Sequence, residues 1–210
     1  MKKKEIAALA VEALKKEYPD ALCSLEYETP LQLLIATRLS AQCTDARVNL
    51  VTPALFERYK TARDFADAEP EEVGKYIYSC GFYKTKSADI VNMCRMILDE
   101  FGGEVPDNMD DLTRLPGVGR KTANLIMGDV YKKPAVVTDT HMIRLSNRLG
   151  LVKTRDPAKV ETEMRKLLAP EESNDFCHRT VLHGRDVCTS RRAKCDICCM
   201  ADFCPKVLDK

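Results

Sequence analysis

Leu115-Pro116-Gly117-Val118-Gly119-Arg120-Lys121-Thr122-Ala123-Asn124 is the stretch of sequence that decides the fold. Two glycines around one valine favour a tight turn whose backbone N–H groups point outward, and the residues after it are typical of a helix start. A turn beside a helix N-terminus suits a phosphate and needs no side chain to read a base. The spacing differs from the Walker pattern GxxxxGK[ST]. A GxG pair alone also fits an ordinary glycine turn between two helices, so the whole string carries the prediction.

Lys121 is an unusual residue for its place in this helix. Val118, Thr122 and Leu125 fall on one face, with Lys121 on or beside it. A lysine there either extends its ammonium group to solvent or is partly desolvated, which would free the amine as a nucleophile. Asp139, in Val137-Thr138-Asp139-Thr140-His141, precedes another predicted helix and suits its N-cap. The alternative is a carboxylate that faces Lys121 across a pocket.

Outward from this stretch, the chain is predicted to be helical almost throughout. Thr29-Pro30-Leu31-Gln32 has the pattern of a helix start with a capping box. The strand-like run Ala135-Val136-Val137 is too short to build a sheet, so we expect an all-α fold. The other predicted helices cover an amphipathic segment from Ile6 to Leu14 and the segments Val48–Tyr59 and Ser87–Phe101, and two more open at Pro70 and at Asp156-Pro157.

Four of the ten cysteines form a cluster near the C-terminus with the spacing C-x6-C-x2-C-x5-C: Cys188, Cys195, Cys198 and Cys204. The surrounding chain is poor in periodic apolar residues and needs a cross-link, which a metal centre can supply. The pattern predicts a four-thiolate site, and zinc and an iron–sulfur cluster both remain open. Cys199 adjoins the cluster as a possible competing ligand. The remaining five are interpreted as packing residues: Cys23, Cys43, Cys80, Cys94 and Cys177.

Composition limits the possible classes of protein. The 210 residues are 45% hydrophobic and 31% charged, which argues against disorder. No run of about 18 apolar residues predicts a membrane span, and Glu5 and Glu12 argue against an export signal, so the cysteines are expected to be thiols or ligands.

The formal net charge of +1 conceals a strong asymmetry. Residues 1–113 carry −6, residues 114–166 carry +7, and residues 167–210 are neutral. A basic segment that contains the glycine turn indicates a polyanion-binding face, although uneven surface salt-bridging explains the charge alone more simply.

Taken together, these motifs resemble the endonuclease III family of helix–hairpin–helix DNA glycosylases with a [4Fe–4S] cluster. The hairpin, Asp139-Thr140-His141, Leu182-His183-Gly184-Arg185 and the four-cysteine tail occur in the family's order, and Ser40 to Asp45 matches its SAQ-x-TD motif. The resemblance covers nearly the whole chain. It implies two lobes, a six-helix domain at 22–133 and a discontinuous domain at 1–21 plus 134–210 that carries the cluster, with the active site in the cleft between them.

The resemblance also implies a chemistry. The chain would be a bifunctional glycosylase/AP lyase that excises oxidised pyrimidines from duplex DNA and cleaves the strand by β-elimination. Lys121 would form a Schiff base with the sugar, and Asp139 would stabilise the cationic sugar and assist deprotonation. Gln42 would fill the gap left by the extruded base and Phe82, where the family often has Leu, would separate bases. The implied DNA contacts are Gln42, Phe82, Leu115, Gly117, Val118, Gly119, Arg120, His141, Arg191, Arg192 and Lys194.

Two other functions compete with this one. Mismatch-specific relatives of the same fold lack the lysine at the position of Lys121 and form no Schiff base. A non-catalytic DNA-binding module with a structural metal would need neither Lys121 nor Asp139. We also expect a monomer in a bacterial or archaeal cytoplasm, associated with the nucleoid when bound to damaged or abasic DNA.

Overall fold

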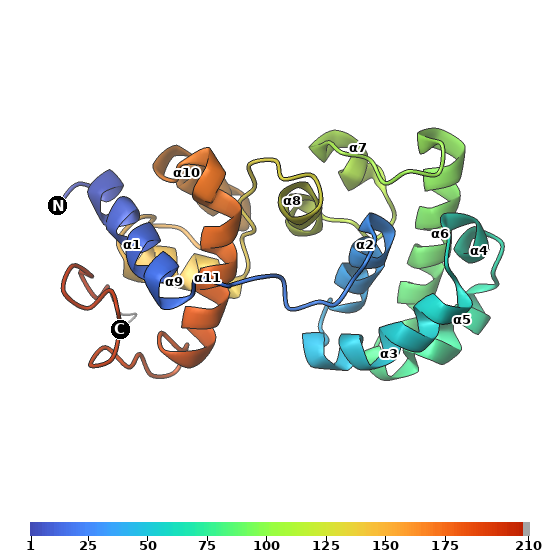
Figure 1. Ribbon diagram of the computed structural model, residues 1–210, viewed down its shortest axis with the longest axis horizontal. Coiled ribbons are helices and arrows are strands. Elements are labelled where there is room, and N and C mark those ends of the chain that lie inside the picture. Colours follow the sequence, from blue (N-terminus) through green and yellow to red (C-terminus); the bar gives the residue numbers. More distant parts are fainter. Residues whose placement is uncertain (208–210) are drawn as a thin grey trace. The chain divides into compact units, whose positions relative to one another are not determined.

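The computed structural model describes residues 1–207 (Figure 1). Every regular element among them is helical, and the one β-type contact there is an isolated antiparallel bridge between Cys188 and Ala193. The predicted all-α fold is confirmed. None of the described helices has both the length and the apolar character that a membrane span requires.

The chain folds as two compact units, Ser24–Tyr131 and Met1–Cys23 together with Lys132–Lys210, which we call the central and the terminal unit. In the central unit, α6 packs against α2, α4 and α5, and α2 also contacts α3 and α8. Apolar side chains of α2 and α6 are fully buried there, among them Leu34 and Ile90. The helices are α2 (Pro30–Leu39), α3 (Asp45–Arg58), α4 (Ala62–Ala66), α5 (Pro70–Ile77), η1 (Tyr78–Cys80), α6 (Tyr83–Phe101), α7 (Met109–Arg114) and α8 (Arg120–Asp129).

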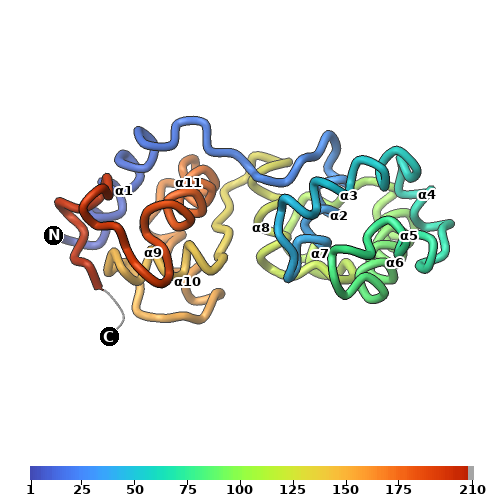
Figure 2. The backbone as a smooth tube through the Cα atoms, turned by 90° about the horizontal axis from the view of Figure 1, so that it is seen from below, coloured from blue at the N-terminus to red at the C-terminus, as the bar shows by residue number. Residues whose placement is uncertain are grey.

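The terminal unit joins the two ends of the sequence. α11 contacts both α1 and α9, and α10 contacts both as well (Figures 1 and 2). The cysteine-rich tail returns to α9, where the Val207 N–H donates to the Arg148 carbonyl at 3.1 Å. Its helices are α1 (Lys3–Glu17), α9 (Thr140–Arg148), α10 (Pro157–Leu167), η2 (Pro170–Glu172) and α11 (Ser173–Asp186).

Two helix starts differ from the sequence prediction. Thr29 caps α2 as expected, since its Oγ1 accepts the Gln32 N–H at 3.2 Å, but Gln32 Oε1 accepts from the Glu28 N–H at 2.7 Å. The capping box is therefore shifted by one residue. α6 begins at Tyr83, four residues before the expected Ser87. Its first turn carries two lysines that interrupt the apolar pattern.

Candidate functional site

The glycine turn joins α7 to α8 in the central unit. The Val118 N–H donates to the Leu115 carbonyl at 3.1 Å, and Gly117 has φ +75°, a conformation that glycine adopts without strain. The side chains of Leu115 and Val118 are buried and anchor the turn in its own unit. Of the predicted DNA contacts, Leu115 and Val118 are therefore buried residues that shape the turn.

An ion pair between Arg38 and Asp89 packs against the glycine turn. Arg38 at the end of α2 donates from Nε and Nη2 to Asp89 Oδ2 on α6, at 2.8 and 2.6 Å. A Cβ built on Gly117 would lie 2.5 Å from Arg38 Nε and 3.0 Å from Asp89 Oδ2. Both side chains are mostly buried, so the backbone of Gly117 rests directly on this pair. The glycine thus serves close packing as well as turn geometry.

The N-terminus of α8 is open on its outer side. Gly119 occupies the N-cap position with extended backbone, and in the described chain no side chain caps this helix. A Cβ at Gly119 would meet nothing within 4 Å. The partial positive charge of the helix end, with exposed Arg120 and Lys121 in its first turn, therefore faces a space that can hold an anion.

Lys121 is exposed in the structure. This exposure agrees with the alternative in which the ammonium group of Lys121 reaches solvent. If this amine acts as a nucleophile, a bound ligand must first displace the water around it.

Gln42 and Phe82 share a rare backbone conformation. They have φ +55° and +48°, in the left-handed region that costs a non-glycine residue about 1–2 kcal/mol. Both side chains are exposed, Phe82 by 66%. Both predicted base-stack residues are thus exposed on the central unit, Gln42 between α2 and α3 and Phe82 at the N-cap of α6.

Asp139 lies in the terminal unit at the start of α9. Its Oδ1 accepts the Met142 N–H at 2.7 Å, so it caps this helix as predicted. His141 follows in the first turn, where its Nδ1 lies 3.1 Å from Arg144 Nη2, and burial lowers the pKa of His141. A Cβ on Gly184 would lie 2.5 Å from His141 Nδ1. The glycine of Leu182-His183-Gly184-Arg185 therefore permits α11 to approach α9.

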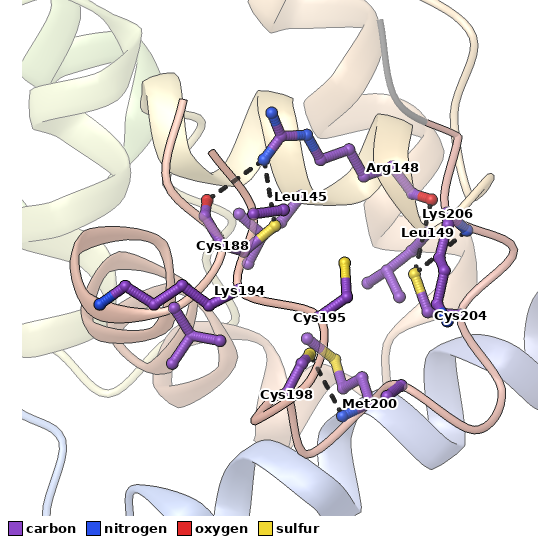
Figure 3. A pocket seen from close by; sticks show the side chains of 13 residues that line it. Leu145, Arg148, Leu149, Cys188, Lys194, Cys195, Cys198, Met200, Cys204 and Lys206 are labelled. Carbon is purple, nitrogen blue, oxygen red and sulfur yellow. Dashed lines mark hydrogen bonds between the residues drawn. The ribbon is translucent and has the colours of Figure 1, made fainter. Parts of the chain in front are cut away.

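The four predicted ligands line one pocket of the terminal unit (Figure 3). Arg148 on α9 organises the first of them, since Nη1 donates to the Cys188 Sγ at 3.3 Å and to the Thr189 carbonyl at 2.7 Å. Backbone N–H groups of Met200 and Lys206 lie 3.4 Å from the sulfurs of Cys198 and Cys204.

These sulfurs suit an electron-rich thiolate site. N–H donors that point at sulfur stabilise thiolate ligands and tune them when they are bound to metal. Burial raises the pKa of the Cys198 and Cys204 thiols, so their thiolates need a positive centre nearby. Within residues 1–207, no three His, Cys, Asp or Glu side chains are already gathered closely enough for a single ion. Four cysteines that line one pocket are a donor set that a thiolate-bound metal centre requires.

The other cysteines lie elsewhere. Cys199 is not among the residues that line the pocket, and burial raises its pKa to about 11. Cys80, Cys94 and Cys177 are buried as expected, whereas Cys23 and Cys43 are only half-buried.

The first cysteine loop carries the predicted basic contacts. Arg191, Arg192 and Lys194 are exposed. Thr189 Oγ1 donates to the Arg192 carbonyl at 2.6 Å and accepts the Arg192 N–H at 3.2 Å, which closes the turn beneath them. The Cys188–Ala193 bridge closes it further. The loop thus presents three cations on an ordered backbone.

One buried cation was not identified from the sequence. Lys86 is 1% exposed, and its Nζ donates to two backbone carbonyls in the central unit. Lys86 precedes Ile90 by four residues, so both lie on the apolar face of α6. A lysine at this helical spacing is the sequence feature that could have identified the buried cation.

Comparison with known proteins gives consistent results. Residues 35–170 match the model of the HhH-GPD superfamily base excision DNA repair protein. The chain is 48% identical over 204 residues to endonuclease III of Synechocystis sp., covering 97% of this chain and 93% of that protein. It is 39% identical over 188 residues to endonuclease III of Bacillus subtilis, covering 89% and 86%. The solved structure of a trapped endonuclease III–DNA covalent intermediate superposes with TM-score 0.91 at 40% identity, covering 98% of this chain and 97% of the other.

Proposed function

Because this chain belongs to the HhH-GPD superfamily of base excision DNA repair proteins, and within it to the endonuclease III family, we propose that it removes oxidised pyrimidines from duplex DNA as a DNA glycosylase with AP lyase activity. The observation that carries this proposal is Lys121, exposed in the first turn of α8 beside a glycine turn that can hold a phosphate. A relative that only hydrolyses the base bond needs no amine there.

We assign the nucleophilic step to Lys121. Its neutral Nζ attacks C1′ of the damaged nucleotide, the N-glycosidic bond breaks, and the base leaves with a proton. The sugar ring opens to a Schiff base. Asp139 stabilises the cationic sugar and assists removal of the C2′ proton, after which the C3′–O bond breaks and the 3′ phosphate leaves. Water hydrolyses the imine and regenerates the amine. Since Lys121 is exposed in the free protein, bound DNA has to supply its desolvation.

The remaining predicted contacts divide by role. The open N-terminus of α8 holds a phosphate through backbone N–H groups, and Arg120, His141, Arg191, Arg192 and Lys194 add contacts that position the duplex. Gln42 and Phe82 enter the base stack when the damaged base is extruded, and exposed left-handed loops suit that task. Bacterial relatives support an enzyme of a bacterial cytoplasm, and we propose that it is a monomer that associates with the nucleoid when bound to DNA.

Borohydride trapping tests the assigned chemistry. With duplex DNA that contains thymine glycol or an abasic site, reduction should yield a covalent protein–DNA adduct. Lys121→Ala should yield none, whereas Lys153→Ala, an exposed lysine in the same basic segment, should yield as much as the wild type. No adduct with the wild type, or an adduct that survives Lys121→Ala, overturns the assignment.

We further propose that Cys188, Cys195, Cys198 and Cys204 hold a [4Fe–4S] cluster. The surrounding N–H donors and the four half-buried thiols in one pocket support it. These four cysteines would hold the cluster as a cross-link that orders the basic loop, and the bond changes at the sugar would not involve it. Purified protein should be brown and contain about four irons and labile sulfide per chain. Colourless protein with one zinc ion would exclude the cluster.

A further inference from the structure

Lys86 is a buried lysine that the chemistry above does not use. Its side chain is among the largest fully buried ones of the described residues. Nζ donates to the Leu39 carbonyl at 2.7 Å and to the Cys80 carbonyl at 2.8 Å. Burying an ammonium group costs free energy unless hydrogen-bond acceptors surround it. We therefore ask which parts of the fold these two hydrogen bonds hold in place.

The two acceptors end two different helices. Leu39 is the last residue of α2 and Cys80 is the last residue of η1. Carbonyls at a helix C-terminus lack partners within the helix and carry partial negative charge, which a cation satisfies. A single ammonium group thus closes both helix ends.

Each helix end leads directly into a strained loop. Gln42 follows Leu39 by three residues and Phe82 follows Cys80 by two, and both have positive φ. Burial lowers the pKa of Lys86, and the nearby Cys43 and Cys80 oppose that shift. The residues at which the two loops begin, Leu39 and Cys80, are therefore both hydrogen-bonded to Lys86 Nζ.

We propose that Lys86 is a positioning residue that holds the Gln42 and Phe82 loops in a single arrangement for entry into the DNA base stack. The inference rests on the proposed function, because these loops meet a base stack only if the chain extrudes a base from duplex DNA. Without the ammonium group, two buried carbonyls lose their donor, and both loops are free to relax toward unstrained backbone.

The test compares Lys86→Met with Arg95→Met. Arg95 lies on the same helix, and its Nε donates to the Ala66 carbonyl at 2.9 Å, which ties α6 to α4 and not to the loops. Single-turnover excision of thymine glycol from a duplex is measured beside cleavage of an abasic site in a single-stranded oligonucleotide, where no base has to leave a paired stack.

Lys86→Met should slow duplex excision about tenfold and leave single-strand cleavage within about twofold of the wild type. Arg95→Met should leave both rates near the wild-type values even if it lowers the thermal midpoint. Equal losses on both substrates, or equal effects of the two variants, would reduce Lys86 to a purely structural role and overturn the inference.

A double-mutant cycle gives an independent readout. In a Gln42→Ala/Phe82→Ala background, Lys86→Met should cost less than about twofold, because residues that act through one another are not additive. The same tenfold loss in both backgrounds, or full activity of the Gln42→Ala/Phe82→Ala protein, contradicts the inference. If Lys86→Met does not fold, Lys86→Gln retains an amide donor, and its loss should again be confined to the duplex substrate. Failure of the wild type to excise the base refutes the proposed function instead.

Discussion

Gly117 and Arg38 are in direct contact, and a Cβ on the glycine would lie 2.5 Å from the guanidinium Nε. The contact joins the turn before α8 to the end of α2. It connects the proposed phosphate site to a partly buried ion pair of the central unit, Arg38 with Asp89. The two glycines of the turn are therefore expected to differ in what they do.

Serine substitutions should separate stability from DNA binding at this turn. Gly117→Ser forces a side chain into positive φ and into the ion pair, and should lower the free energy of unfolding by at least about 1 kcal/mol. Gly119→Ser has space and extended backbone, and its hydroxyl can cap α8, so stability should be kept or raised while DNA affinity falls. Urea unfolding and binding titrations measure both. Equal destabilisation by the two variants would contradict this division.

Asp139 should act as a helix cap and as a carboxylate, and two substitutions can distinguish the roles. Asn is as good an N-cap as Asp, so Asp139→Asn should leave stability unchanged and slow excision about a hundredfold. Asp139→Ala should also cost about 1 kcal/mol of stability.

Asp156 offers the matched control for the cap. Its Oδ1 accepts the Lys159 N–H at 3.0 Å at the start of α10. Asp156→Ala should therefore lose the cap energy and keep full activity. If Asp139→Asn excises as fast as the wild type, the carboxylate has no catalytic role.

The basic loop should contribute to the salt dependence of DNA binding. Arg191→Ala should reduce the slope of log K against log salt by about one, the value for a single phosphate contact. Lys75→Ala is the control, because that lysine pairs with Glu72 at 2.6 Å in the central unit and should leave the slope unchanged. An unchanged slope with Arg191→Ala would remove Arg191 from the phosphate contacts.

The carboxylate of Glu172 should stabilise the fold only at pH values above its pKa in the folded protein. Hydrogen bonds from Lys15 and Arg179 lower the pKa of Glu172 from 4.5, so its contribution is fully present above about pH 4.5 and is lost as the pH falls through the lower folded value. Glu172→Gln should cost about 1 kcal/mol at neutral pH, and the difference from the wild type should shrink in acid.

Urea unfolding of both proteins at several pH values measures this difference and cancels any acid effect that they share. Glu163→Gln removes an exposed pair with Lys166 and should change little at any pH. A Glu172 difference that stays constant with pH would contradict the assigned ion pairs.

Two helices show where prediction from the sequence fails. α11 was not predicted, because polar residues at buried positions interrupt the apolar periodicity of its inner face. These residues are Arg179, Thr180 and His183. They are accommodated by partners distant in sequence: Arg179 by Glu172, and His183 by Tyr18 Oη at 3.2 Å and Cys198 Sγ at 3.4 Å. The short α4 has too few turns to show a period.

The sequence by itself determined the features that depend on neighbours within a few residues. The all-α content, the caps at Thr29 and Asp139, and the glycine turn follow from local hydrogen bonds and backbone preferences. Only the tertiary structure decided which charges are buried and what they hold. The Arg38–Asp89 pair beneath Gly117 spans 51 positions, and Lys86 reaches back 47 positions to Leu39. A buried charge is stable only where segments distant in the sequence bring hydrogen-bond acceptors or an opposite charge to it. No pattern of neighbouring residues predicts which distant segments these are.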